Sequence, residues 1–141
     1  MNKYKVWLEI NKRAIEHNIK TFRLLLTPKT ELWSVVKSNA YGHGLVLFAK
    51  LAESGVDGFC VDSVVEGLKL RKEGIKKSIL VLGPTLPSSF LIAKKFNLTI
   101  IISNIEGLKK MVNNKIKPNF HLKIDTGMHR QGFYPEEISK I

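Results

Sequence analysis

Cysteine is nearly absent from this chain of 141 residues, since Cys60 is the only one. Intrachain disulfides and metal sites built from cysteine clusters are therefore excluded. Cys60 stands in the apolar run GFCV, which is typical of a buried, unreactive thiol. No apolar run is long enough to span a bilayer, and Lys3, Lys5 and Glu9 interrupt the N-terminal stretch that a signal peptide would need. We therefore expect a soluble intracellular protein that does not contact membranes.

Acidic residues are few, with 12 Asp and Glu against 23 Lys and Arg, and the formal net charge is +11. A basic chain of this kind can bind nucleic acid. However, arginine is scarce, although it is the residue best suited to bidentate contacts with phosphate and guanine, and the lysines are scattered along the chain. A solvated, lysine-rich surface is the simpler interpretation. A basic interaction module remains a minor alternative, which salt-sensitive retention on DNA or RNA would support.

What the sequence does contain is a regular alternation of short apolar runs and amphipathic stretches. The length and the hydrophobic fraction of 44% fit one globular domain with a real core. The alternation predicts βαβ units around a parallel sheet that is covered on both faces. The predicted strands are residues 32–36, 58–61, 78–82, 98–102 and 120–124.

The two ends of the chain depart from this alternation. Residues 5–10 (KVWLEI) suit a strand with one solvated face, yet such a strand has no evident partner in a βα array. Asn11 is suited to cap a helix from about residue 13 to residue 25. Residues 135–141 (PEEISKI) begin a helix that the chain does not complete. Since a closed (β/α)₈ barrel needs eight strands, the chain is either an open five-stranded sheet or the front part of a longer protein, and the unfinished helix favours the latter.

The stretch VVKSNAYGHG (35–44) places Lys37 directly after the first predicted strand. In parallel α/β folds, ligands bind at this carboxyl end of the strands. Apolar neighbours such as Val35 and Val36 would desolvate the amine and favour its neutral form, which attacks aldehydes and abstracts protons. Tyr41 offers a phenol to an anion such as a phosphate. The residues leave open the alternative that Lys37 simply extends into solvent beside a glycine turn.

A second stretch, HLKIDTGMHRQGF (121–133), places more polar side chains at the same rim. Lys123 lies on the fifth predicted strand, Asp125 begins a turn at its end, and Arg130 follows in the loop. We expect Asp125 to shape that turn. His43 and His129 are interpreted as hydrogen-bonding loop residues without a catalytic role, and no metal site is predicted.

The two stretches, in this order and on these strand ends, resemble the alanine racemase family, and the likeness extends through the whole chain. Members of that family use pyridoxal 5'-phosphate (PLP) and combine an N-terminal (β/α)₈ barrel with a mainly β C-terminal domain. The resemblance implies that residues 12–141 form about five βα units of a truncated barrel with parallel strands. It also implies that residues 1–11 supply a strand to the C-terminal domain, which is missing here.

The resemblance further implies roles for four residues. Lys37 matches the lysine that forms the Schiff base with PLP and then accepts a proton on one face of the α-carbon. Tyr41 matches the tyrosine that binds the PLP phosphate, and Arg130 the arginine that contacts the PLP phenolic oxygen and the substrate carboxylate. Lys123 matches a lysine that many members carry as a carbamate. Such an anion would accept hydrogen bonds from Arg130, whereas two facing cations would repel each other.

The function that the resemblance implies is the interconversion of L-alanine and D-alanine for peptidoglycan synthesis, by a cytoplasmic homodimer. In the family the second base is a tyrosine from the partner subunit's C-terminal domain, so we expect this piece to be inactive by itself. Two alternatives stay open. One is a racemase of broader specificity or a related D-amino-acid lyase. The other is a non-catalytic PLP-binding protein, which would need Lys37 but not the pair of Lys123 and Arg130.

Overall fold

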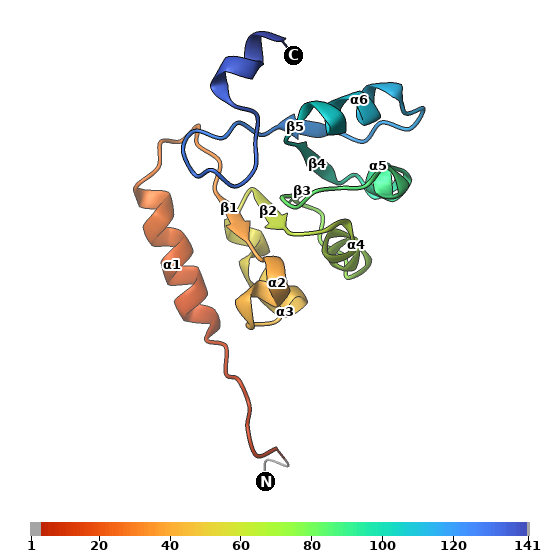
Figure 1. Ribbon diagram of the computed structural model, residues 1–141. Coiled ribbons are helices and arrows are strands. Elements are labelled where there is room, and N and C mark those ends of the chain that lie inside the picture. The colour runs from red at the N-terminus through yellow and green to blue at the C-terminus, as the bar shows by residue number, and fades with distance from the viewer. Residues whose placement is uncertain (1–3, 141) are drawn as a thin grey trace.

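A parallel five-stranded sheet forms the centre of the computed structural model, which describes residues 4–140 (Figure 1). Its strands are β1 (Trp33–Val35), β2 (Gly58–Val61), β3 (Ser78–Val81), β4 (Thr99–Ile102) and β5 (Phe120–Leu122). All five were predicted, and the structure shortens several of them by one or two residues at their ends. The strands are hydrogen-bonded in the order β1-β2-β3-β4-β5, and every neighbouring pair is parallel.

This strand order distinguishes a barrel from an open doubly wound sheet. Each right-handed crossover adds the next strand on the same side, so the connecting helices all cover one face of the sheet. In a doubly wound sheet the order reverses and helices cover both faces. The predicted partial (β/α)₈ barrel is thus confirmed, but the expectation of a sheet covered on both faces is not met within the described residues, where the connecting helices cover one face. Within the described residues, β1 and β5 each pair with a single strand and leave two open edges.

Helices occupy every interval between the strands, as the alternation predicts, and one further helix precedes β1. They are α1 (Lys12–Leu24), α2 (Lys37–Tyr41), α3 (Leu45–Ala52), α4 (Val64–Lys72), α5 (Phe90–Lys95) and α6 (Ile105–Asn113). Short 3₁₀ helices are η1 (Glu53–Gly55), η2 (Pro87–Ser89) and η3 (Pro135–Lys140). The last of these corresponds to the helix expected from residue 135, and in this chain it is a 3₁₀ helix. Asn11 caps α1 as predicted, because its side chain accepts a hydrogen bond of 3.2 Å from the Ala14 amide.

Burial is concentrated in the middle of the sheet. All four residues of β2 are buried, while the three residues of β5 are exposed. This gradient arises because helices and neighbouring strands cover the central strands, whereas the edge strands have only one neighbour. Cys60 lies in β2, 8% exposed, and burial raises the pKa of its thiol, which fits the unreactive role expected of it.

The amino ends of the first two strands are held to α1 by an ion pair. Arg23 of α1 lies 2.5 Å from a carboxylate oxygen of Asp57, and the same oxygen accepts a hydrogen bond of 2.6 Å from the Leu32 amide. The Leu32 amide and the Arg23 guanidinium together hold the pKa of Asp57 below its usual range. These contacts stabilise the end of the sheet opposite to the expected ligand site.

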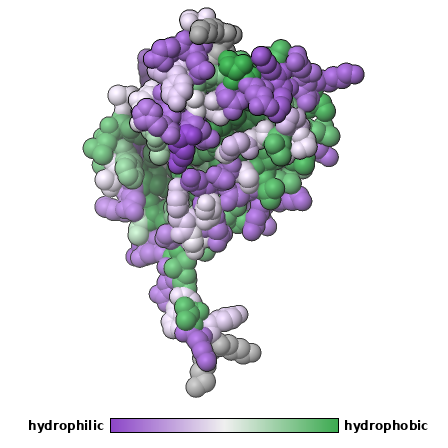
Figure 2. All heavy atoms as spheres, viewed as in Figure 1, coloured by the Kyte–Doolittle hydropathy of each residue, from purple (hydrophilic) through white to green (hydrophobic). Residues whose placement is uncertain are grey.

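Residues 5–10, expected to form a strand, form neither a helix nor a strand in this chain. They run as an extended segment away from the rest of the molecule (Figure 1). Val6 and Leu8 are 86% and 61% exposed, and Figure 2 shows hydrophobic residues along this segment. Exposed apolar residues without a partner fit the expectation that another sheet pairs here, which stays a prediction. Among the described residues, no helix is both long and apolar enough to cross a membrane.

Candidate active site

Lys37 begins a helical turn of unusual hand. In α2, the residues Ser38, Asn39, Ala40 and Tyr41 all have φ between 52° and 57°, so the turn is left-handed. The left-handed conformation costs roughly 1–2 kcal/mol per non-glycine residue, and it persists only where surrounding contacts impose it. Such strained segments cluster at functional sites, so this turn is a candidate part of the active site.

Local hydrogen bonds stabilise the left-handed turn. The Asn39 side chain accepts a bond of 2.9 Å from the Leu45 amide, which joins the turn to the start of α3. The Ala40 carbonyl lies 2.9 Å from Nδ1 of His43 and also accepts a bond from the His43 amide. Gly42 follows with φ of 94°, a value that glycine adopts without strain. His43 thus acts as the hydrogen-bonding loop residue that the sequence indicated.

The surroundings of Lys37 differ in one respect from the expectation. Val36 is fully buried, but Val35 is 42% exposed because β1 is an edge strand. Only one of the two expected apolar neighbours therefore shields the lysine. Lys37 itself is half-buried.

Asp125 organises the second loop, as expected. Its Oδ1 accepts hydrogen bonds from the amides of Gly127, Met128 and His129 at 2.9–3.0 Å, and its Oδ2 accepts one of 3.0 Å from the Arg130 amide. The amides of Gly127 and His129, followed by those of Arg130 and Met128, hold the pKa of this carboxyl below its usual range. The carboxylate therefore fixes the backbone from which the Arg130 side chain extends.

A cavity of about 250 Å³ brings the two motifs together at the carboxyl ends of the strands. Its lining includes Lys37, Asp62, Gly83, Arg130 and Gln131. The Gln131 amide group donates a hydrogen bond of 3.2 Å to the Leu82 carbonyl and so joins the loop after β5 to the end of β3. A carbon atom added at Gly83 would lie 2.4 Å from the Asp62 carbonyl oxygen, so glycine is needed for this close approach.

Tyr41 and Lys123 do not line this cavity. Tyr41 is 61% exposed. Lys123 follows β5 rather than lying within it, although its amide continues the pairing with a bond of 2.8 Å to the Ile102 carbonyl. Among the described residues, the Lys123 side chain makes no hydrogen bond to Arg130. Arg130 also lines a neighbouring cavity of about 290 Å³, together with His129, Ser103 and Tyr134.

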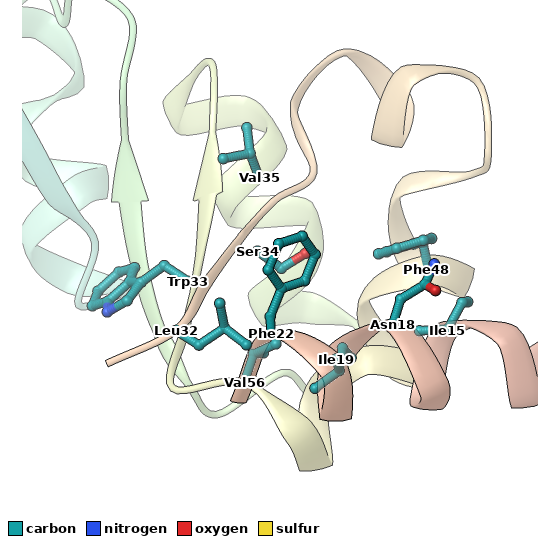
Figure 3. A pocket seen from close by; sticks show the side chains of 10 residues that line it. All are labelled: Ile15, Asn18, Ile19, Phe22, Leu32, Trp33, Ser34, Val35, Phe48 and Val56. Carbon is teal, nitrogen blue, oxygen red and sulfur yellow. The ribbon is translucent and has the colours of Figure 1, made fainter. Parts of the chain in front are cut away.

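A larger hollow of about 450 Å³ lies between α1 and β1 (Figure 3). Side chains of Ile15, Ile19 and Phe22 from α1 face residues 32–35 and Phe48 across it. Its lining is mostly apolar and contains no ionisable side chain. Despite its size, this hollow offers no acid or base, and its one hydroxyl, on Ser34, has no ionisable lining residue to activate it, so the smaller cavity at Lys37 is the better candidate for the active site.

Several residues of the site were not predicted from the sequence, among them Asp62 and Gly83, which line the cavity, and also Gln131 and Glu66. Gln131 lies within the second motif, but a glutamine in a loop has no distinctive pattern that would predict its contact with the end of β3. Glu66 of α4 accepts hydrogen bonds from the backbone of the Lys37 turn. The only sequence signal for it is the capping pattern formed with Ser63, whose hydroxyl accepts a bond of 3.3 Å from the Glu66 amide.

The donor set at the cavity fits an anionic ligand that carries an aldehyde, such as PLP. Lys37 supplies an amine and Arg130 a guanidinium, and both line one space at the end of the sheet where ligands of parallel α/β folds bind. Among the described residues, no group of histidine, cysteine and carboxylate side chains is arranged to hold a metal ion.

Comparison with known proteins agrees with this geometry. Residues 10–141 match the family model described as "Alanine racemase, N-terminal domain". An alanine racemase from Methylacidiphilum infernorum is 40% identical over 96% of this chain and 37% of its own length. An "Amino-acid racemase" from Enterococcus faecalis is 41% identical over 97% of this chain and 19% of its own length.

The fold gives the same result. The crystal structure of an alanine racemase from E. faecalis matches 93% of this chain and 37% of its own, with a TM-score of 0.86 and 34% identity. The chain thus spans a little over a third of the alanine racemases it matches. With a family model covering nearly all of its residues, this chain belongs to the alanine racemase N-terminal domain family.

Proposed function

We propose that this chain supplies the PLP-binding part of an alanine racemase that interconverts L-alanine and D-alanine. The observation that carries the proposal is that Lys37 and Arg130, far apart in the sequence, line one cavity at the carboxyl ends of the strands. Membership of the family supports the same activity.

In this proposal the Lys37 amine would hold PLP and would be released when the amino group of alanine takes its place. The free amine would then remove or deliver the α-proton on one face of alanine, while the second base acts on the opposite face. PLP, when bound, withdraws electrons from the α-carbon and so stabilises the deprotonated amino acid. The left-handed turn fixes the backbone of the residues after Lys37, and so fixes the point from which this side chain extends toward the cavity. Tyr41, on the same turn, is the proposed hydrogen-bond partner of the PLP phosphate.

Arg130 is the proposed partner of the PLP phenolic oxygen and of the alanine carboxylate. A guanidinium binds a carboxylate through two parallel hydrogen bonds, which orients the amino acid as well as holding it. The four backbone bonds to Asp125 hold the loop that carries this arginine. Lys123 is proposed to carry a carbamate, whose negative charge would orient Arg130 once both side chains turn toward the ligand.

The proposal extends to the protein in which this chain acts. A second base is needed on the opposite face of the α-carbon, and we propose that a tyrosine from the partner subunit of a homodimer provides it. D-Alanine would then enter peptidoglycan synthesis from the cytoplasm. Broader substrate specificity is a second candidate, which the similarity to an amino-acid racemase favours.

The test is a chimera in which residues 1–141 replace the matching segment of the M. infernorum relative. Formation of D-alanine from L-alanine is measured by chiral chromatography. We expect turnover in the chimera and none when Lys37→Ala is introduced. A chimera that folds and assembles like the relative but forms no D-alanine would contradict the proposed function, and comparable rates with several amino acids would favour the broader specificity.

A further inference from the structure

We propose that Glu66 is a positioning residue that holds the left-handed turn after Lys37 and thereby aims the Lys37 amine into the cavity. The role in aiming the amine rests on the proposed function, whereas the anchoring of the turn does not. Glu66 lies in the first turn of α4, the helix that follows β2, and so belongs to a different βα unit from Lys37.

The Glu66 carboxylate joins the ends of two neighbouring strands. Its Oε1 accepts a hydrogen bond of 2.8 Å from the Ser38 amide and a longer one of 3.5 Å from the Asn39 amide. Its Oε2 accepts one of 2.8 Å from the Asp62 amide, directly after β2. One side chain therefore fixes the loop after β1 against the loop after β2.

These bonds fix the backbone on the C-terminal side of Lys37. On the N-terminal side, the Val36 amide donates a hydrogen bond of 2.8 Å to the Cys60 carbonyl, which continues the pairing of β1 with β2. The backbone of Lys37 is thus held both before and after the residue. Without the carboxylate, the Ser38 and Asn39 amides would lose their acceptor, and the residues would gain by leaving the left-handed conformation.

The contacts require both carboxylate oxygens. A glutamate at this helix position commonly accepts a bond from the backbone of the cap residue itself. Here Ser63 is the cap, and Glu66 instead reaches the Asp62 amide and the turn after β1. Glutamine has one acceptor oxygen, so in Glu66→Gln either the Ser38 side or the Asp62 side must face an N–H donor.

The first experiment measures hydrogen exchange of backbone amides by NMR in the full 141-residue chain. In the unsubstituted chain, the Ser38 and Asn39 amides should exchange far more slowly than those of the extended segment near Glu9. In Glu66→Gln we expect exchange of both amides to be about tenfold faster, with the amides of β2 and β3 unchanged. The matched control is Glu106→Gln, also in the first turn of a helix, whose carboxylate pairs with Lys110 on the surface.

The second experiment follows the reaction of PLP with Lys37 through the visible absorbance of the adduct and through peptide mapping after borohydride reduction. We expect several-fold slower labelling of Lys37 in Glu66→Gln, and unchanged labelling of Lys69 and Lys72 on the same helix. A general loss of stability would instead speed exchange of the β2 and β3 amides, which the first experiment follows. Adding Ser38→Gly to Glu66→Gln should restore part of the Lys37 rate, because glycine adopts the left-handed conformation without strain.

Fast exchange of the Ser38 and Asn39 amides in the unsubstituted chain would overturn the inference, even if Glu66→Gln failed to fold. Unchanged exchange of these amides in a folded Glu66→Gln variant, or labelling of Lys37 at the original rate, would also overturn it. If the unsubstituted chain showed no selective labelling of Lys37, the proposed function would fail, and with it the aiming role. The exchange rates would then still decide whether Glu66 anchors the turn.

Discussion

Replacing Arg71 with methionine is expected to destabilise the chain strongly, because one guanidinium binds four backbone carbonyls. Its Nη1 donates to the carbonyls of Ile75 and Lys77 at 2.8 and 2.7 Å. Its Nε and Nη2 donate to the carbonyls of Phe96 and Asn97 at 3.0 and 3.1 Å. Arg71 thus ties α4, the helix that carries Glu66, to the segment before β3 and to the end of α5.

The magnitude follows from the number of bonds and the exposure of the side chain. A hydrogen bond to a charged group contributes about 1.5–3 kcal/mol when it is shielded from water. Arg71 is only half-buried, so water can replace part of each contact. Taking about 1 kcal/mol for each bond, Arg71→Met should lower the free energy of unfolding by about 3–4 kcal/mol. Arg71→Lys, which keeps a charge but not the planar fork, should lose roughly half of that.

The assay is urea unfolding followed by far-ultraviolet circular dichroism. With a denaturant slope of about 2 kcal/mol per molar urea, a loss of 3 kcal/mol moves the midpoint down by roughly 1.5 M. The control is Lys72→Met, an exposed neighbour on the same helix, which should change the unfolding free energy by less than about 0.5 kcal/mol. Midpoints for both Arg71 variants that match the control would refute the assignment of these four bonds.

Three further predictions concern the second loop and the open sheet. Because Asp125 has a lowered pKa in the folded chain, its contribution to stability should be complete above its ordinary pKa of about 3.9 and should be lost as the pH falls through its lower folded value. An NMR titration giving Asp125 an apparent pKa at or above 3.9 would contradict this. Gly132→Ala should lower the urea midpoint much more than Gly127→Ala. Both glycines have φ near 140°, so the backbone strain of an alanine is similar at the two positions. A carbon atom added at Gly132 would lie 2.5 Å from the Asp125 nitrogen, whereas one added at Gly127 would meet open space. Equal effects of the two substitutions would show that the close contact is unimportant. Since β1 and β5 leave open edges and an apolar hollow lies beside β1, the chain should self-associate, and a stable compact monomer in sedimentation velocity would count against this.

The strands and helices could be predicted from the sequence, because burial of the sheet requires apolar runs at regular intervals. β2 was predicted at its observed bounds, since all four of its residues are buried. The edge strands β1 and β5 came out shorter than predicted, because their ends lack a second neighbour. Residues 5–10 carry the pattern of a strand, but a strand needs a partner and this chain provides none within its described residues.

The candidate site could be predicted from the sequence only in part. Lys37 and Arg130 follow predicted strands, and the parallel topology brings strand ends to one rim, so their convergence could be anticipated. The left-handed turn could not be predicted, because none of Ser38, Asn39 and Ala40 is a glycine, the residue that usually marks this conformation. Tertiary hydrogen bonds impose the conformation instead. The part played by Glu66 was hidden for the same reason, since its acceptor role depends on a turn in another βα unit.

The central claim, that Lys37 reacts with PLP in a formed site, is tested most directly by reductive trapping. The chain is incubated with PLP, reduced with borohydride and digested, and the phosphopyridoxyl group is located by mass spectrometry. Lys69→Ala serves as a control for an exposed lysine and Lys37→Ala for the site itself. We predict that the label concentrates on Lys37, that Lys37→Ala removes it, and that Lys69→Ala leaves it unchanged. Label spread evenly over the surface lysines, with no preference for Lys37, would contradict the account.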